Sequence, residues 1–369
     1  MIIKTITCHD VYNYGASLQA YALQTFLTKQ GHDVEIIDYM PDYLNRTYNF
    51  WYISEKSRFY NISQRNPLIH LLYSIWNIPR TYATCGRIFP FKKFKSSYLK
   101  CTHKYRTYLE LKQNPPKADI YIAGSDQIWN SLLPNGKDPA FFLNFGEKNT
   151  KRISYAASFG IPSISKNLKK QTQLYLSCFN KISVREYTGT KILQELGYNS
   201  TVVVDPVFLL KSNEWKDLIT TTKRIIKEDY ILVYDIFQDN EQLTAATKEL
   251  SAKYNLKIVS INDNKKSSYA HVNISNGGPI EFLNLLYNAS FVISCSFHAT
   301  AFSVIFNKPF WVFYRKSNIS RMMDFLKIIN LEQCLNPQSF EPNEINWNKV
   351  NAQLKEHVSK SIEFLLQNL

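Results

Sequence analysis

Cysteine is sparse and irregularly placed in this sequence. The chain of 369 residues has six cysteines, none of which forms a CxxC pair. Zinc sites and disulfide frameworks depend on cysteines at short, characteristic spacings. We therefore expect neither of them, and no other cluster of residues suggests a metal site.

Long apolar runs and targeting signals are also missing. No run approaches the ~18 apolar residues that a membrane span needs. The first residues, MIIKTITCHD, contain neither a charged leader region nor an apolar region of useful length. We therefore expect a cytoplasmic protein without an export signal.

Acidic residues are too few to balance the basic ones. The chain has 44 Lys and Arg against 30 Asp and Glu, a net charge of +14. Such an excess indicates an anionic partner: nucleic acid, a membrane surface, or a phosphorylated or carboxylated substrate. The basic residues are spread along the chain and form no basic arm, which argues against nucleic acid. We keep a nucleic-acid-binding protein as the alternative from a different functional class.

What the sequence does contain is an alternation of strand and helix patterns. The chain is long enough for two hydrophobic cores, because single cores stop growing near ~250–300 residues. Strand patterns begin at IIKTITC and VEIIDY, with a helical pattern between them, and continue at DIYIAG, RISYAAS, KISVRE and TVVVDP. After a polar stretch at 211–228 they restart at YILVYD, LKIVSI, FVIS and PFWVFY. This order predicts an α/β protein with two Rossmann-like domains.

The predicted domains cover residues 1–210 and 211–346. An aromatic and basic insertion at about 40–110 interrupts the first, and we expect it to form helices or loops. We also expect it to face the acceptor and a membrane, with Lys92, Lys93 and Lys95 contributing charge. A helical pattern at 347–369 can pack on either domain, and we place it with the first.

Ligands of such folds bind where parallel strands end and helices begin. Asn13, Tyr14 and Gly15 stand at the first such junction. Glycine lets the backbone approach a ligand, and a helix N-terminus offers free N–H groups. An ordinary turn with an Asn cap explains the residues equally well, because no GxGxxG dinucleotide motif is present.

Two further junctions carry polar side chains. Asp126, Gln127 and Trp129 follow DIYIAG, and a carboxylate, an amide and an indole together suit a sugar; a helix cap is the simpler role for Asp126. Arg185 follows KISV, where its guanidinium could hold a carboxylate or phosphate, or make a surface ion pair with Glu186 or another neighbour.

The segment SCSFHATAFSVIF places His298 just after a predicted strand. Ser296 is a suitable N-cap, so His298 should lie in the first helical turn. The helix dipole disfavours a cation there and favours an anion. His298 alone could still be a cap or core residue.

Taken together, the motifs VYNYGASLQAYALQ, AGSDQIWN, SVRE, VVVDPVFLL, GPIEFLNLLYNASFVIS and SFHATAFSVIFNKPF resemble the polysaccharide pyruvyl transferase family. They occur in the family's order, from about residue 11 to about 330. The resemblance implies a glycosyltransferase-B-like arrangement, with two Rossmann-like domains facing a cleft. It also implies transfer of an enolpyruvyl unit from phosphoenolpyruvate to a sugar as a cyclic ketal, with no cofactor.

The resemblance also assigns roles to residues. Arg185 and His298 match the family's anion-binding Arg and its His. The family's Arg-Leu-His element is replaced here by Ser296-Phe297-His298. Either another cation supplies the charge, with Arg321 and Arg315 as candidates, or this branch of the family uses another donor. We expect His298 to donate a proton to the enolpyruvyl methylene and Asp126 to accept one from the attacking hydroxyl.

Binding roles and partners complete these expectations. We place the donor against Arg185, Arg321, Ser296, Phe297, Asn13, Tyr14 and Gly15, and the acceptor against Gln127 and Trp129. The acceptor would be a polyprenyl-diphosphate-linked sugar of bacterial surface polysaccharide assembly, reached from the inner membrane face. A nucleotide-sugar-dependent glycosyltransferase is the alternative enzyme for such a cleft.

Overall fold

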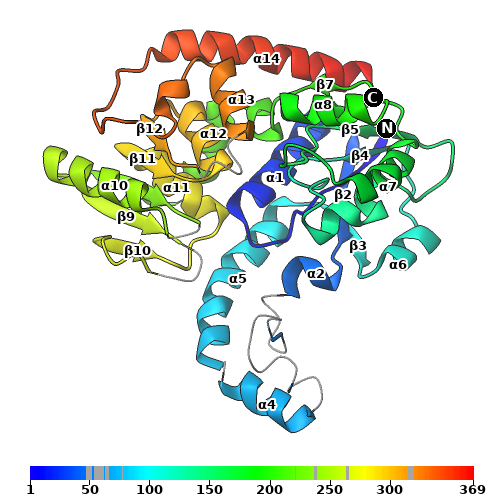
Figure 1. Ribbon diagram of the computed structural model, residues 1–369, viewed down its shortest axis with the longest axis horizontal. Helices are drawn as coiled ribbons and strands as arrows, with labels where there is room; N and C mark the ends of the chain where they lie inside the picture. Colours follow the sequence, from blue (N-terminus) through cyan, green and yellow to red (C-terminus); the bar gives the residue numbers. More distant parts are fainter. Residues whose placement is uncertain are drawn as a thin grey trace.

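The computed structural model describes residues 1–46, 52–53, 62, 66–76, 78–220, 222–236, 239–262, 266–314 and 320–369. Its described residues form two five-stranded parallel sheets with helices around them (Figure 1). The predicted α/β class with two Rossmann-like units is therefore confirmed.

The first sheet has the strand order β3-β2-β1-β4-β5. Every neighbouring pair is parallel, and Ile3 of β1 lies opposite both Val34 of β2 and Ile120 of β4. Isolated bridges join Ile153 to Lys181 and Ala157 to Val184, which place a short two-stranded sheet beside β5. The strands are β1 (Ile2–Ile6), β2 (Asp33–Tyr39), β3 (Cys101–Tyr105), β4 (Ile120–Ala123), β5 (Lys151–Ser154), β6 (Ser183–Val184) and β7 (Thr201–Val202).

The second sheet repeats this pattern with the order β10-β9-β8-β11-β12. Its central strand, β8, is buried throughout, as expected for a parallel strand that is covered on both faces. The strands are β8 (Tyr230–Tyr234), β9 (Lys257–Ile261), β10 (Val272–Ile274), β11 (Phe291–Ser294) and β12 (Phe310–Val312).

Helices connect the strands and cover the sheets. Helix α1 is buried on most of its surface because it lies between the two halves, and even its polar residues Ser17, Gln19 and Gln24 are buried. The helices are α1 (Tyr14–Lys29), α2 (Asp42–Asn45), α4 (Pro67–Trp76), α5 (Ile78–Tyr98), α6 (Tyr108–Gln113), α7 (Lys166–Leu176), α8 (Tyr187–Glu195), α9 (Ser212–Thr220), α10 (Glu241–Tyr254), α11 (Pro279–Asn288), α12 (Phe297–Ile305), α13 (Ser320–Ile328) and α14 (Trp347–Gln367).

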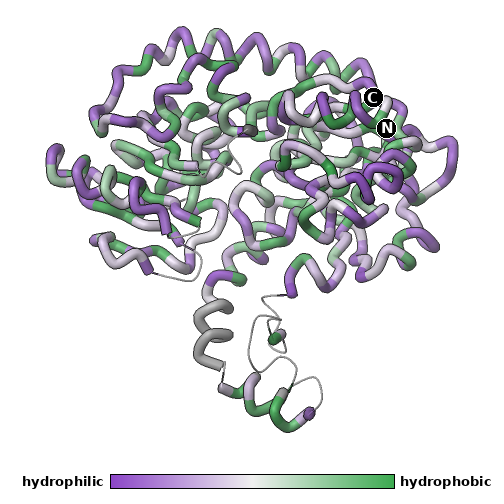
Figure 2. The backbone as a smooth tube through the Cα atoms, viewed as in Figure 1, coloured by the Kyte–Doolittle hydropathy of each residue, from purple (hydrophilic) through white to green (hydrophobic). Residues whose placement is uncertain are grey.

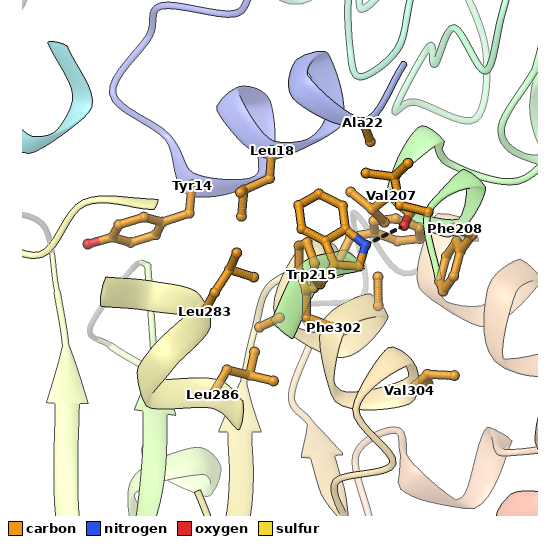
Figure 3. Packing of buried hydrophobic residues seen from close by; sticks show 14 of the residues in the cluster. Tyr14, Leu18, Ala22, Val207, Phe208, Trp215, Leu283, Leu286, Phe302 and Val304 are labelled. Atoms are coloured by element: carbon orange, nitrogen blue, oxygen red, sulfur yellow. Dashed lines mark hydrogen bonds between the residues drawn. The ribbon is translucent and has the colours of Figure 1, made fainter. Parts of the chain in front are cut away.

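The largest core fills the space between the two sheets (Figure 3). Leu18 of α1, Leu283 of α11 and Phe302 of α12 point toward the fully buried Trp215 of α9. The indole N–H of Trp215 donates to the carbonyl of Val207 at 3.1 Å, so its polar group is satisfied. This shared core holds the N-terminal ends of α1 and α12 close together.

The C-terminal helix α14 runs along one side of the molecule (Figure 1). The backbone N–H of Val204 donates to Ser361 Oγ at 2.9 Å, and Lys151 Nζ donates to the carbonyl of Leu369 at 2.9 Å. The helix is thus tied to the β5–β7 region of the first half, and its Leu354 also packs in the shared core.

Residues 40–110 were predicted to be helices or loops, and part of that segment lies outside the described residues. The described part includes α2, α4 and α5, but residues 101–105 form the edge strand β3, which the prediction missed. Helices α4 and α5 form an arm that extends away from both sheets (Figures 1 and 2).

Lys95, near the end of α5 that joins the arm to the first sheet, was expected to contribute charge toward a membrane. Lys95 donates to Asp38 Oδ1 at 2.7 Å and to Asp10 Oδ2 at 2.9 Å. Its charge is therefore used inside the fold, and the prediction that it faces a membrane is wrong. Lys92 and Lys93, by contrast, are exposed.

Candidate active site

His298 occupies the position that the sequence predicted. Strand β11 ends at Ser294, the Ser296 hydroxyl accepts from the Ala299 N–H at 3.4 Å, and His298 lies in the first turn of α12. The imidazole is nearly buried, with its Nε2 3.5 Å from Asp205 Oδ2. Nε2 has no hydrogen-bond partner among the described residues.

Gly15 provides the space that His298 occupies. A methyl group placed on Gly15 would lie 1.9 Å from Nδ1 of His298 and 2.2 Å from its Cγ. No other residue type leaves room for the ring against the first turn of α1. The close approach expected at this glycine therefore exists, but a side chain of the other half makes it.

Arg185 lies just beyond β6, between two carboxylates. Its Nη1 donates to Asp205 Oδ2 at 2.5 Å and its Nη2 to Asp126 Oδ1 at 3.2 Å. The guanidinium also lies over the Phe297 ring, 4.5 Å from the centroid. Arg185 is therefore a buried residue with defined geometry, and its surface-pair role with Glu186 is excluded.

Asp205 is the site residue that the sequence analysis did not single out. Oδ1 caps the short 3₁₀ helix Pro206–Leu209 by accepting from the Val207 N–H at 3.1 Å, while Oδ2 faces Arg185 and His298. Burial raises the pKa of Asp205, but the charges of His298 and Arg185 outweigh burial and hold the pKa below its ordinary value. Asp205 therefore links the His and the Arg as an ionised group.

Asp126 lies at the carboxyl end of β4 in a left-handed conformation, with φ of 73°. This region is uncommon for residues other than glycine and is frequent at functional sites. Burial raises the pKa of this carboxyl, but the charges of Arg185, His298 and Arg321 outweigh burial, and the net shift is downward. The side chain keeps 21% of its surface exposed, so an ionised oxygen can reach a ligand.

Arg321 joins the same group from helix α13. Its Nη1 lies 4.0 Å from Asp126 Oδ1, and its Nε is buried without a partner among the described residues. Gln127, with its amide oxygen turned toward Arg321, accepts from Nη2 at 3.0 Å and from Nη1 at 3.2 Å. Arg315, the other candidate cation, lies outside the described residues.

Several predicted ligand contacts require correction. Trp129 is 1% exposed, stacks on Phe142 at 5.5 Å and donates to the Phe141 carbonyl at 3.0 Å, so it is a core residue and cannot stack on a sugar. Tyr14 is fully buried and stacks on Phe282, so its side chain cannot contact the donor. Composition did not distinguish these core positions from a binding surface.

The remaining predicted residues have structural roles beside the site. Asn13 caps α1 by accepting from the Ala16 N–H at 3.2 Å. Ser296 caps α12, as described above, and Phe297 provides the ring beneath Arg185. Each of these side chains fixes an element that carries a charged residue of the site.

The site thus brings together two acids, Asp126 and Asp205, with Arg185, Arg321 and His298. Within the described ranges, no group of three or more His, Cys, Asp or Glu residues could hold a metal ion. Nor is any helix in that part of the chain long and apolar enough to cross a membrane.

Solved structures with a similar fold include complexes with UDP-GlcNAc and with UDP. UDP-GlcNAc 2-epimerase from Neisseria meningitidis, bound to UDP-GlcNAc, is similar with a TM-score of 0.50 at 9% identity, covering 100% of this chain and 99% of the other. The S. aureus MnaA–UDP co-structure gives 0.48 at 13%, covering 96% and 87%. At 9% identity the likeness to the epimerase concerns the fold alone, and this fold is the glycosyltransferase-B-like arrangement that the sequence predicted.

Curated proteins yield no match to the chain. The family model for polysaccharide pyruvyl transferases, however, matches residues 13–317, which includes Asp126, Arg185, Asp205 and His298. Since this match covers most of the sequence, the chain belongs to the polysaccharide pyruvyl transferase family.

Proposed function

We propose that this transferase moves the enolpyruvyl unit of phosphoenolpyruvate onto a sugar as a cyclic ketal. The observation that supports this most directly is a set of three buried nitrogens that make no well-formed hydrogen bond among the described residues: Arg185 Nε, Arg321 Nε and His298 Nε2, the last of which lies 3.5 Å from Asp205 Oδ2. Buried polar groups are normally hydrogen-bonded. Three such groups on neighbouring basic side chains suit an anionic substrate.

Charge balance points to the way the donor binds. Phosphoenolpyruvate carries a carboxylate and a phosphate, and burying them requires matched cations. Arg185 and Arg321 both face Asp126, the more exposed of the two acids, whereas Asp205 is fully buried. An anionic donor would bind the Arg321 guanidinium and Nε of Arg185, while the ion pair with Asp205 keeps Arg185 in position.

The reaction then needs two proton movements. His298 gives a proton to the methylene carbon while a sugar hydroxyl adds to the neighbouring carbon, and Asp126 accepts that hydroxyl's proton. A second hydroxyl of the same sugar then displaces phosphate from this carbon and gives its proton to His298, while Asp126 passes its proton to the departing phosphate. This closes the ketal, releases inorganic phosphate and restores both side chains. The arginines stabilise the charge on the leaving group. This sequence requires no metal or organic cofactor.

The family's description, polysaccharide pyruvyl transferase, supports a sugar as the acceptor. We infer a sugar of a growing surface polysaccharide, carried on a polyprenyl diphosphate at the inner face of the membrane. We assign Gln127, which lies beside Asp126 and contacts Arg321, to a hydroxyl of this sugar. The net charge of +14 suits both an anionic donor and an anionic membrane surface.

Calorimetric titration tests the donor. We expect saturable binding of phosphoenolpyruvate and no comparable binding of a panel of UDP- and GDP-sugars. Mass spectrometry of the glycan from cells with and without the gene should then show one pyruvate per repeat only when the gene is present. Binding of a nucleotide sugar with no binding of phosphoenolpyruvate would support the glycosyltransferase alternative instead.

A further inference from the structure

The helix α4 exposes the kind of surface that most helices bury. The exposed fractions are 69% for Leu68, 65% for Leu72, 48% for Ile75 and 72% for Trp76, and Leu71 is 41% exposed. These positions follow the i, i+3, i+4, i+7, i+8 spacing of one helical stripe. A contiguous apolar stripe in water marks a surface that binds something apolar.

The stripe lies at the far end of the arm. Helix α4 is remote from both sheets, and α5 connects it to the rest of the molecule (Figures 1 and 2). Neither sheet can therefore cover the stripe without a large movement of the arm.

The sequence around the stripe is strongly basic. Residues 46–98 contain nine Lys and Arg and one acidic residue, Glu55. Arg87 and Lys95 serve the fold at the base of the arm, and Lys92 and Lys93 are exposed. A partner for this arm must therefore combine apolar and negative character.

We propose that α4 is the membrane-docking element of the protein and lies in the interface of an anionic bilayer. The helix has 10 residues, about 15 Å at 1.5 Å per residue, too short for the ~30 Å hydrocarbon core. It would lie parallel to the surface, with its leucines among the acyl chains and Trp76 at the headgroup level. A second copy of the chain is a poorer partner, because pairing two arms would bring like charges together.

The base of the arm connects this docking to the active site. Arg87 of α5 donates to the Tyr12 carbonyl at 2.8 Å and to the Tyr14 hydroxyl at 3.1 Å. The Tyr14 hydroxyl in turn donates to the Gly277 carbonyl at 3.1 Å. Since these loops belong to both halves and flank the N-terminus of α1, the arm holds the active site at a fixed orientation to the bilayer.

This orientation suits a lipid-carried acceptor, and in that respect the inference rests on the proposed function. Docking itself depends only on the arm. It can therefore be tested separately from pyruvyl transfer.

Co-sedimentation of the full chain with vesicles is the first test. The Leu68→Ser/Leu72→Ser/Trp76→Ser variant should partition at least tenfold more weakly than the parent onto vesicles of 30% phosphatidylglycerol in phosphatidylcholine. The matched control is Leu132→Ser/Leu174→Ser, which removes two leucines of 77% and 68% exposure outside the arm. We expect the control to bind as the parent does. Circular dichroism would check that each variant is folded.

Charge and depth give two independent readouts. Lys92→Ala/Lys93→Ala should weaken binding to the anionic vesicles at low salt and leave binding to pure phosphatidylcholine unchanged. Brominated lipid should quench tryptophan fluorescence in the parent, and Trp76→Phe should reduce that quenching, because among the other described tryptophans Trp129, Trp215 and Trp311 are buried and Trp347 is half-buried in α14.

The outcomes separate the two proposals. Equal partitioning of the parent and the triple-serine variant would overturn the docking proposal. So would a concentration-dependent dimer, seen by analytical ultracentrifugation, that the triple variant abolishes. A parent that partitions onto vesicles but does not bind phosphoenolpyruvate would overturn the proposed function and leave α4 docking intact.

Discussion

Gly15→Ala is the substitution whose effect the structure defines most directly. The new methyl group would lie 1.9 Å from Nδ1 of His298, against the 3.4–4 Å of an ordinary contact. The nearest ring atom must therefore move by about 1.5 Å, or α1 and α12 must separate by a similar distance. Either movement displaces the imidazole from Asp205 and from the proposed donor.

Two magnitudes follow from this displacement. A misplacement of 1 Å in a catalytic group can cost about 10²-fold in rate, so we expect kcat for pyruvyl transfer to fall at least 100-fold. Forcing an extra methyl into a packed site costs about 1–3 kcal/mol of folding free energy. Because Arg185 and Arg321 keep their positions, donor affinity should change much less than kcat.

Two measurements check the reasoning: phosphate release with a pyruvylatable acceptor, and urea denaturation. Gly189→Ala is the control, since this helical glycine faces Val184, whose nearest atom would lie 3.2 Å from the added methyl, and is away from His298. The double variant Gly15→Ala/His298→Ala should regain stability relative to the sum of the single variants, because the clash disappears, but not activity. A folded Gly15→Ala enzyme within fivefold of the parent kcat would refute the argument.

Other predictions concern the charges of the site and of the arm base. His298→Asn should abolish turnover in a folded protein because the amide cannot deliver a proton, and a rate within tenfold of the parent would remove His298 from the mechanism. Arg321→Ala should weaken phosphoenolpyruvate binding in calorimetry by about 1–3 kcal/mol, whereas the control Arg224→Ala, on the exposed surface, should not. Asp205→Asn should lower the free energy of unfolding by about 3 kcal/mol, because Arg185 loses a buried partner; a urea midpoint equal to the parent's would contradict this. Burial raises the pKa of Asp38, but its partners at the arm base lower it to about 2 from an ordinary 3.8. Its folded pKa is thus depressed, so its contribution of about 2 kcal/mol is present above pH 4 and lost as the pH falls toward 2. Asp38→Asn should show a correspondingly shallower acid loss in denaturation at several pH values.

The sequence predicted the parts of the fold that depend on local pattern. Buried parallel strands such as β8 and β11 are continuous apolar runs, and Ser296 is a cap that needs only its own helix. The edge strands β3 and β10 were missed because their sequences, CTHKY and VNI, are short and partly polar and only one neighbouring strand pairs with them.

The site was predictable only in part, because its contacts join residues far apart in the chain. Asp205 precedes a proline, which indicates a helix cap, and its Oδ1 does cap the 3₁₀ helix Pro206–Leu209. Its contact with His298 spans the two halves and leaves no local trace. Trp129 shows the opposite error, since its position after a strand suggested a ligand, whereas the packing of Phe142 and neighbouring rings made it core.

The absence of an arginine two residues before His298 has a physical counterpart in the structure. At that position Ser296 caps α12, and Arg321 approaches Asp126 from a different helix, α13. An electrostatic site depends on where charges lie and not on which element carries them. Arg321, which we propose binds the donor, also donates to Gln127, which we assign to the acceptor. These hydrogen bonds therefore connect the two proposed substrate sites. A substitution at Arg321 should therefore affect donor affinity and acceptor KM together, whereas an independent donor clamp would affect only the first.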